Sequence, residues 1–142
     1  MLDAIRHRRD FLKAARALRS PADCFLLQAR RREPDEGPPV QAVRVGFTCS
    51  RKIGNAVIRN RARRRLRALA REVLPTSGRP GWDYVLVARP GATSTAPFLT
   101  MRSALLRALA RLHRDQPAET AADRAELQRP SGTDTSASRG PQ

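Results

Sequence analysis

A stretch of 28 residues, from Arg44 to Arg71, contains no aspartate or glutamate and restricts the fold more than any other part of the chain. Its ten basic residues are Arg44, Arg51, Lys52, Arg59, Arg61, Arg63, Arg64, Arg65, Arg67 and Arg71. Apolar residues recur at helical spacing in its second half and form one narrow stripe, made of Ala62, Leu66, Leu69 and Val73. The sequence therefore predicts a helix from Asn55 or Ala56 to Leu74, ended by Pro75, with one side packed on the protein.

The other side of this helix is predicted to be cationic. Its outer row follows helical spacing and consists of Asn60, Arg64, Arg67 and Arg71, flanked by Arg61, Arg63 and Arg65. Solvated helix faces usually alternate acids with bases, because such pairs stabilise a helix slightly, whereas like charges at this spacing repel. We expect an external polyanion to offset the repulsion. Guanidinium groups bind phosphate with two hydrogen bonds, which favours nucleic acid, and the apolar side lacks the Trp and Phe typical of membrane-surface helices.

Charge and composition divide the chain into two parts. The 142 residues include 28 Lys+Arg and 13 Asp+Glu, a formal net charge of +15, and this length suits one domain. From residue 115 on, the composition becomes acidic and rich in Pro, Ser, Thr and Gly. We therefore predict one nucleic-acid-binding domain over residues 1–114 and a mostly disordered tail over 115–142.

The chain shows neither a secretory signal nor an apolar run long enough to cross a bilayer. Its two cysteines, Cys24 and Cys49, form no CxxC pair. These features predict a reduced, cytoplasmic protein that does not bind membranes.

The remaining periodicities predict two more helices and three strands. Helical spacing of Phe11, Ala14, Ala15 and Leu18 indicates a first helix, ended at Ser20-Pro21. Strands are expected over residues 24–30, 42–49 and 82–89, and a last helix over about 97–114, supported by leucines that include Leu99 and Leu105. This order predicts an α+β class, a small single-domain sandwich of one sheet and about three helices.

A turn that contains Gly54 and the candidate N-cap Asn55 joins the second strand to the long helix. The run RVGFTCSRKIGNAVIRNRARRRLRALARE, residues 44–72, closely resembles the bacterial ribonuclease P protein subunit. The family's pattern Lys-Ile/Val-Gly-x-Ala-Val-x-Arg-Asn-Arg-x-Lys/Arg-Arg is matched by residues 52–64. The likeness extends over about residues 6–114 and excludes the tail.

The resemblance implies a mixed sheet with a left-handed βαβ crossover, an exception to the usual handedness. It also implies the function of the subunit that assists endonucleolytic removal of the 5′ leader from precursor tRNA. Its expected partners are the catalytic RNA and precursor tRNA, in a 1:1 ribonucleoprotein with a monomeric protein. The RNA subunit would catalyse hydrolysis with Mg²⁺, and the protein alone would bind no metal. The resemblance implies that six residues of the long helix face the catalytic RNA: Arg59, Asn60, Arg61, Arg63, Arg64 and Arg67. The turn before the helix and the outer row add the other expected RNA-binding residues, Arg51, Lys52, Asn55 and Arg71.

The resemblance further implies a cleft for the single-stranded leader between the first helix and the sheet. Phe11 keeps a family aromatic there, although a core position is an equally good interpretation. Ala15 and Gln28 stand where the family often has further aromatics. Because each stacked base contributes roughly 1–3 kcal/mol, we expect weaker stacking on the leader, partly replaced by hydrogen bonds from Gln28.

No catalytic group is expected in the protein itself. The acids are scattered, and the two histidines, His7 and His113, stand far apart in the sequence. Two other functions remain open from the residues alone. A structural RNA-binding protein of the ribosomal kind would show the same charge. A DNA-binding helix would normally interleave more base-reading side chains than the single Asn60.

Overall fold

The computed structural model describes residues 2–33, 35 and 41–114. Its elements are β1 (Leu2–Ala4), α1 (Arg8–Arg16), β2 (Leu18–Pro21), β3 (Phe25–Arg31), β4 (Val43–Thr48), the 3-10 turn η1 (Arg51–Ile53), α2 (Ala56–Ser77), β5 (Trp82–Ala88), α3 (Ala92–Thr95) and α4 (Phe98–Arg114). The chain divides into a unit up to Ala110, which holds the sheet and the site, and a second unit from Arg111. The predicted tail, residues 115–142, lies outside the described residues.

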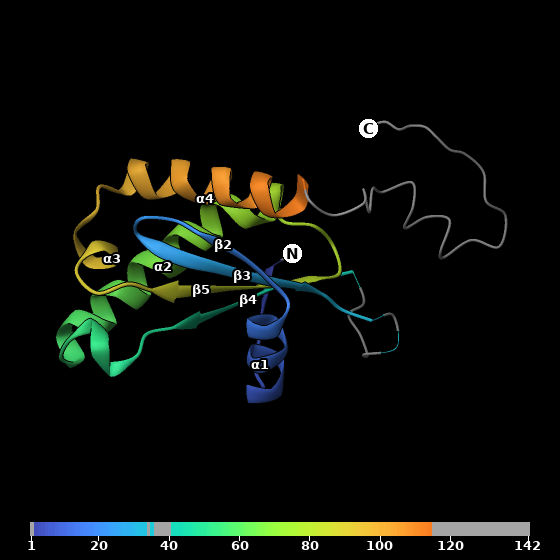
Figure 1. Cartoon of the computed structure of the whole chain (residues 1–142), viewed down its shortest axis with the longest axis horizontal. Coiled ribbons are helices and arrows are strands. Elements are labelled where there is room, and N and C mark those ends of the chain that lie inside the picture. Colours follow the sequence, from blue (N-terminus) through green and yellow to red (C-terminus); the bar gives the residue numbers. More distant parts are fainter. Residues whose placement is uncertain (1, 34, 36–40, 115–142) are drawn as a thin grey trace, which may run out of the picture. The chain divides into compact units, whose positions relative to one another are not determined.

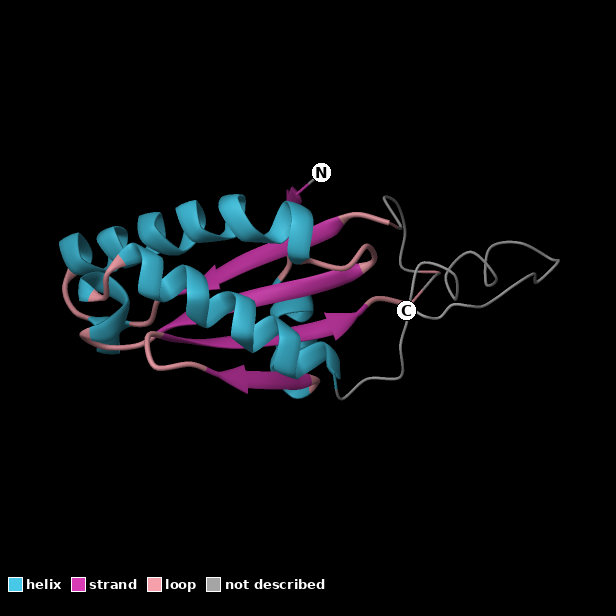
Figure 2. Cartoon of the chain, turned by 90° about the horizontal axis from the view of Figure 1, so that it is seen from above, coloured by secondary structure: helices cyan, strands magenta, loops and turns pink. Residues whose placement is uncertain are grey.

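The five strands form one mixed sheet in the order β1-β4-β5-β3-β2. β1, β4 and β5 run parallel, whereas β3 is antiparallel to both of its neighbours. α2 connects the adjacent parallel strands β4 and β5. Seen with α2 in front and looking along these strands, β5 lies to the left of β4, so that the crossover is left-handed (Figure 2). The α+β class and this crossover are as predicted.

The helices cover the two faces of the sheet unequally. α2 and α4 lie over one face, and α1 lies over part of the other (Figure 1). The predicted apolar stripe of α2 is buried, with Ala62, Leu66 and Leu69 at 0% exposure. Successive residues of a strand point to opposite faces of the sheet, so each strand contributes to the packing on both faces. Tyr84 and Leu86 of β5 are fully buried on the α2 side, and Val85 packs against Ala14 of α1 on the other.

The end of α2 differs from the prediction, because the helix continues through Pro75 to Ser77. Proline removes one amide donor, but other donors near the end reach the carbonyls of the last turn. Thr76 Oγ1 donates to the Val73 carbonyl at 3.3 Å, and the Gly78 amide donates to the Leu74 carbonyl at 2.8 Å. At residue 78 a Cβ atom would lie 2.8 Å from that same carbonyl oxygen, so only glycine fits there.

The first helix is shorter than predicted, and three short elements were missed. α1 ends at Arg16, and Leu18 belongs to β2, where it pairs with Ala29 of β3. The residues after Arg16 therefore pair with β3 through their backbone and do not add another turn to α1. β1, β2 and α3 have only three or four residues each, too few to show a period. On α4, Leu99 is 74% exposed rather than part of the buried side.

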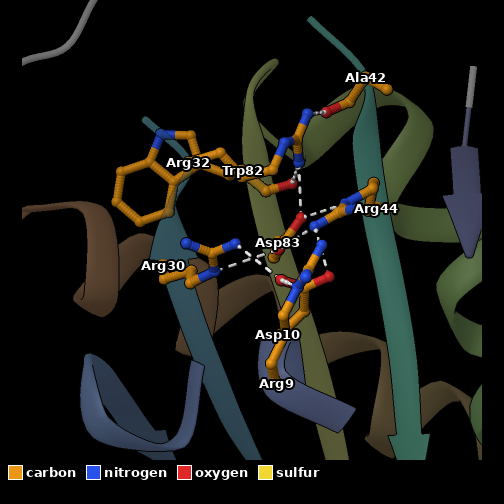
Figure 3. A network of polar contacts seen from close by, with 8 residues as sticks. All are labelled: Arg9, Asp10, Arg30, Arg32, Ala42, Arg44, Trp82 and Asp83. Atoms are coloured by element: carbon orange, nitrogen blue, oxygen red, sulfur yellow. Dashed lines mark hydrogen bonds and ion pairs between the residues drawn. The ribbon is translucent and has the colours of Figure 1, made fainter. Parts of the chain in front are cut away.

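A buried ionic network joins the middle strands (Figure 3). Asp83 of β5 is completely buried and lies in register between Arg30 of β3 and Arg44 of β4. Both carboxylate oxygens of Asp83 accept bonds of 2.7 Å from Arg44, and Arg30 Nε donates at 3.3 Å. Arg32 Nη1 donates a further hydrogen bond of 2.6 Å to Asp83 Oδ1. Arg44, whose side chain is 20% exposed, therefore pairs with this carboxylate and does not belong to the basic surface suggested by its place in the acid-free stretch.

Asp10 extends the same network to α1. Its carboxylate lies 3.3 Å from Arg30 Nη2 and 3.5 Å from Arg44 Nη2. The sequence offered no indication of this contact, because Asp10 is 20 or more residues away from the arginines and from Asp83. The network fixes the start of α1 on the sheet and so determines which strand residues remain uncovered.

We predict that Asp83→Asn lowers the free energy of unfolding by about 3–5 kcal/mol, because it leaves buried guanidinium groups without their anion. Urea denaturation measures this change. Asp23→Asn, at an exposed position, is the control and should shift stability by no more than about 0.5 kcal/mol. Equal stability of the two variants would show that the network contributes nothing.

Candidate nucleic-acid interface

The turn before α2 sets the direction in which the helix leaves the sheet. Gly54 has a φ angle of 146°, a backbone conformation that residues other than glycine rarely adopt. Asn55 caps the helix, and its side-chain oxygen accepts a bond of 3.0 Å from the Ile58 amide, as predicted. Arg59 Nη1 donates to the Gly54 carbonyl at 3.0 Å, so Arg59 is half-buried and stabilises the turn. Arg51 and Lys52 are exposed in η1 beside it.

The predicted outer row of α2 is open to solvent, since Asn60, Arg64, Arg67 and Arg71 are all exposed. Among the described residues, no carboxylate lies within 4.0 Å of a basic nitrogen of any arginine from 59 to 71. Glu72, the next acid, instead pairs with Arg102 of α4 at 2.6 Å. No described carboxylate therefore compensates the positive charge of the outer row.

The arginines beside the outer row are held by the protein. Arg61 Nε and Arg65 Nη1 both donate to the Ser94 carbonyl, at 3.1 Å each, and Arg65 Nη2 donates to the Ala96 carbonyl. These bonds connect α2 to α3, through Ser94, and to the segment that follows α3, through Ala96. Arg63 is half-buried and donates to the Asn60 side chain at 3.3 Å. The expected site residues thus comprise free cations and cations that also have a structural role.

Phe47 of β4 lies under the outer row. The Arg67 guanidinium carbon is 5.9 Å from the centre of its ring, within the range of a cation–π contact. Phe47 is half-buried, and its alternation with Val45 in the strand places it on the α2 side. The ring therefore supports Arg67 in an outward position.

A second surface lies on the α1 face, where α1 leaves part of the strands uncovered. Register and alternation place Leu26, Gln28 and Val87 on this face, and all three are half-buried. We call these three residues, with Phe11 and Ala15 of α1, the α1-side surface. Ala15 is exposed. The sequence did not predict that Leu26 and Val87 belong to this surface, because the face on which they lie depends on the pairing of β3 with β5.

Phe11 has two environments at once. Its ring packs over Gly46, where a Cβ atom would lie 2.5 Å from two ring carbons, and it packs against the buried cluster of Ile5, Ala14 and Val85. The residue nevertheless remains half-exposed. The two interpretations of Phe11, core and ligand contact, are therefore compatible.

The described residues contain no group of three or more His, Cys, Asp or Glu side chains that could hold a metal ion. Burial raises the pKa of the thiols of Cys24 and Cys49 above the ordinary value, which keeps both protonated and poorly nucleophilic at neutral pH. For Cys49 the nearby Arg63 and Arg59 oppose this rise. Within the same part of the chain, no helix is long and apolar enough to cross a membrane.

A mixed sheet with a left-handed crossover, whose crossover helix exposes a row of basic residues, defines an α+β domain with a surface suited to a polyanion. The family model for ribonuclease P matches residues 2–113. The ribonuclease P protein component of Ruegeria pomeroyi is 54% identical over 116 residues, which cover 82% of this chain and 90% of that protein. The component from Paramagnetospirillum magneticum is 43% identical over 114 residues, covering 78% and 83% of the two chains.

Solved structures share the fold. The ribonuclease P protein of Thermotoga maritima superimposes with a TM-score of 0.62 at 25% identity, covering 81% of this chain and 99% of that one. The protein of Staphylococcus aureus gives a TM-score of 0.58 at 22% identity, covering 76% and 93%. The chain belongs to the ribonuclease P protein family. This membership decides against the ribosomal and DNA-binding alternatives.

We predict that the double variant Arg64→Glu and Arg67→Glu binds structured RNA at least tenfold more weakly and with a reduced salt dependence. The two substitutions remove phosphate contacts and add repulsion. Filter binding over a series of salt concentrations measures both effects. Because both side chains are exposed, the thermal melt should remain cooperative, and loss of that melt would mean that the row is structural.

Proposed function

We propose that this chain acts in ribonuclease P by binding the catalytic RNA through α2 and the 5′ leader of precursor tRNA through the α1-side surface. The observation that carries the proposal is the exposed outer row of α2, which has no carboxylate partner among the described residues. The helix holds the backbone of these residues in one fixed row, which lowers the entropy cost of binding a folded polyanion. Release of counterions from the RNA supplies the driving force.

The α1-side surface suits an extended single strand. Leu26 and Val87 offer apolar contact, the half-buried Phe11 offers an aromatic side chain, and Gln28 offers an amide that can donate and accept hydrogen bonds. Arg19 of β2 lies opposite Gln28 in register and is exposed, so that a cation borders the surface. Single-stranded RNA is bound by this combination of stacking, hydrogen bonding and charge.

The two surfaces lie on opposite faces of one sheet, α2 on one and α1 on the other (Figure 1). A protein arranged in this way can bind the catalytic RNA on one side and still contact the leader on the other. In this proposal the RNA subunit performs the hydrolysis with Mg²⁺, and the protein raises the affinity for substrate. The protein is a monomer in a 1:1 complex.

We predict that the protein stimulates leader removal from precursor tRNA by the RNA subunit at low Mg²⁺ concentration. Single-turnover cleavage, with and without protein, measures this, and the stimulation should be larger with a leader of several nucleotides than with one nucleotide. The Arg64→Glu and Arg67→Glu variant is the matched control and should stimulate much less. Unchanged cleavage on adding the wild-type protein would contradict the proposal.

A further inference from the structure

A pocket of about 560 Å³ lies between α2 and the segment that connects α3 to α4. Such a volume falls in the range of about 300–1,000 Å³ typical of small-molecule sites. Its lining includes three arginines of α2, Arg61, Arg64 and Arg65, and the half-buried aromatic residue Phe98. The exposed residues Ala68 and Thr95 border it, so the pocket is open to solvent.

The three arginines have different degrees of freedom. Arg61 is oriented by its Nε bond to the Ser94 carbonyl, and Arg64 is exposed, without a bond to any described residue. Arg65 uses its two Nη groups on Ser94 and Ala96, while its Nε is buried without an acceptor among the described residues. The Ser94 carbonyl therefore orients Arg61 and Arg65 at the pocket, whereas the exposed Arg64 can turn toward a ligand.

We propose that this pocket binds a single unstacked nucleotide of the RNA, with its phosphate on Arg61 and Arg64 and its base against Phe98. The inference rests on the proposed function. Arginine pairs with phosphate through two parallel hydrogen bonds, and an aromatic ring stacks on any base that has left its helix. A duplex phosphate alone would leave the ring without a partner, so the chemistry favours a bulged or looped nucleotide.

Variants at two positions test the pocket without touching the outer row. Phe98→Leu keeps an apolar side chain but removes the aromatic face, and Phe98→Tyr keeps that face. Ala68→Met fills the mouth of the pocket from an exposed position on α2, where methionine is a good helix former. Leu99→Ala is the matched control, because Leu99 is the next residue, is 74% exposed and does not line the pocket.

The measurement is the affinity of the full chain for the RNA subunit over a series of salt concentrations. We expect Phe98→Leu and Ala68→Met to weaken binding at least fivefold without changing the salt slope, since neither removes a charge. Phe98→Tyr and Leu99→Ala should bind like the wild type. Wild-type affinity of Phe98→Leu or of Ala68→Met would overturn the inference. If the wild-type protein itself fails to bind the RNA, the proposed function fails instead.

Discussion

The packing of α2 on the sheet is the interaction on which the rest of the structure depends. Leu66, Leu69 and the neighbouring apolar residues of α2 are fully buried, so the helix can neither rotate nor leave without exposing the core. With that side fixed, the outer row faces solvent by geometry alone. The mutual repulsion of its arginines is tolerated because burial of the apolar stripe stabilises the helix more strongly than pairs of surface charges destabilise it.

Two groups of arginines in this chain have different roles, and they differ in how deeply their side chains are buried. Arg30 and Arg32 are buried beside Asp83, where their charges are matched by carboxylates and stabilise the join between strands and α1. Arg64 and Arg71 are exposed and meet no carboxylate of the described residues. An arginine-rich composition alone could not separate these groups. Only the exposed arginines support the assignment of α2 as a surface that binds a polyanion.

Much of the fold could be predicted, because its long elements have clear periods. The apolar stripe of α2, its cap at Asn55 and the three longer strands follow from local sequence. The short elements and the ion pairs of Asp10 and Asp83 could not be predicted, since they depend on pairing between distant segments. The same limit applies to the site. The outer row was predictable from one helix, whereas Leu26, Val87 and the Phe98 pocket required the tertiary structure.

The central claim is that the outer row of α2 faces the RNA subunit. Arginine footprinting with phenylglyoxal, read by mass spectrometry, tests it residue by residue in the protein alone and in its complex with that RNA. The account predicts that Arg64, Arg67 and Arg71 lose reactivity in the complex, while Arg9 on the opposite side of the sheet, with its side chain 75% exposed, stays reactive. Protection of Arg9 with continued reactivity of the three α2 arginines would contradict it.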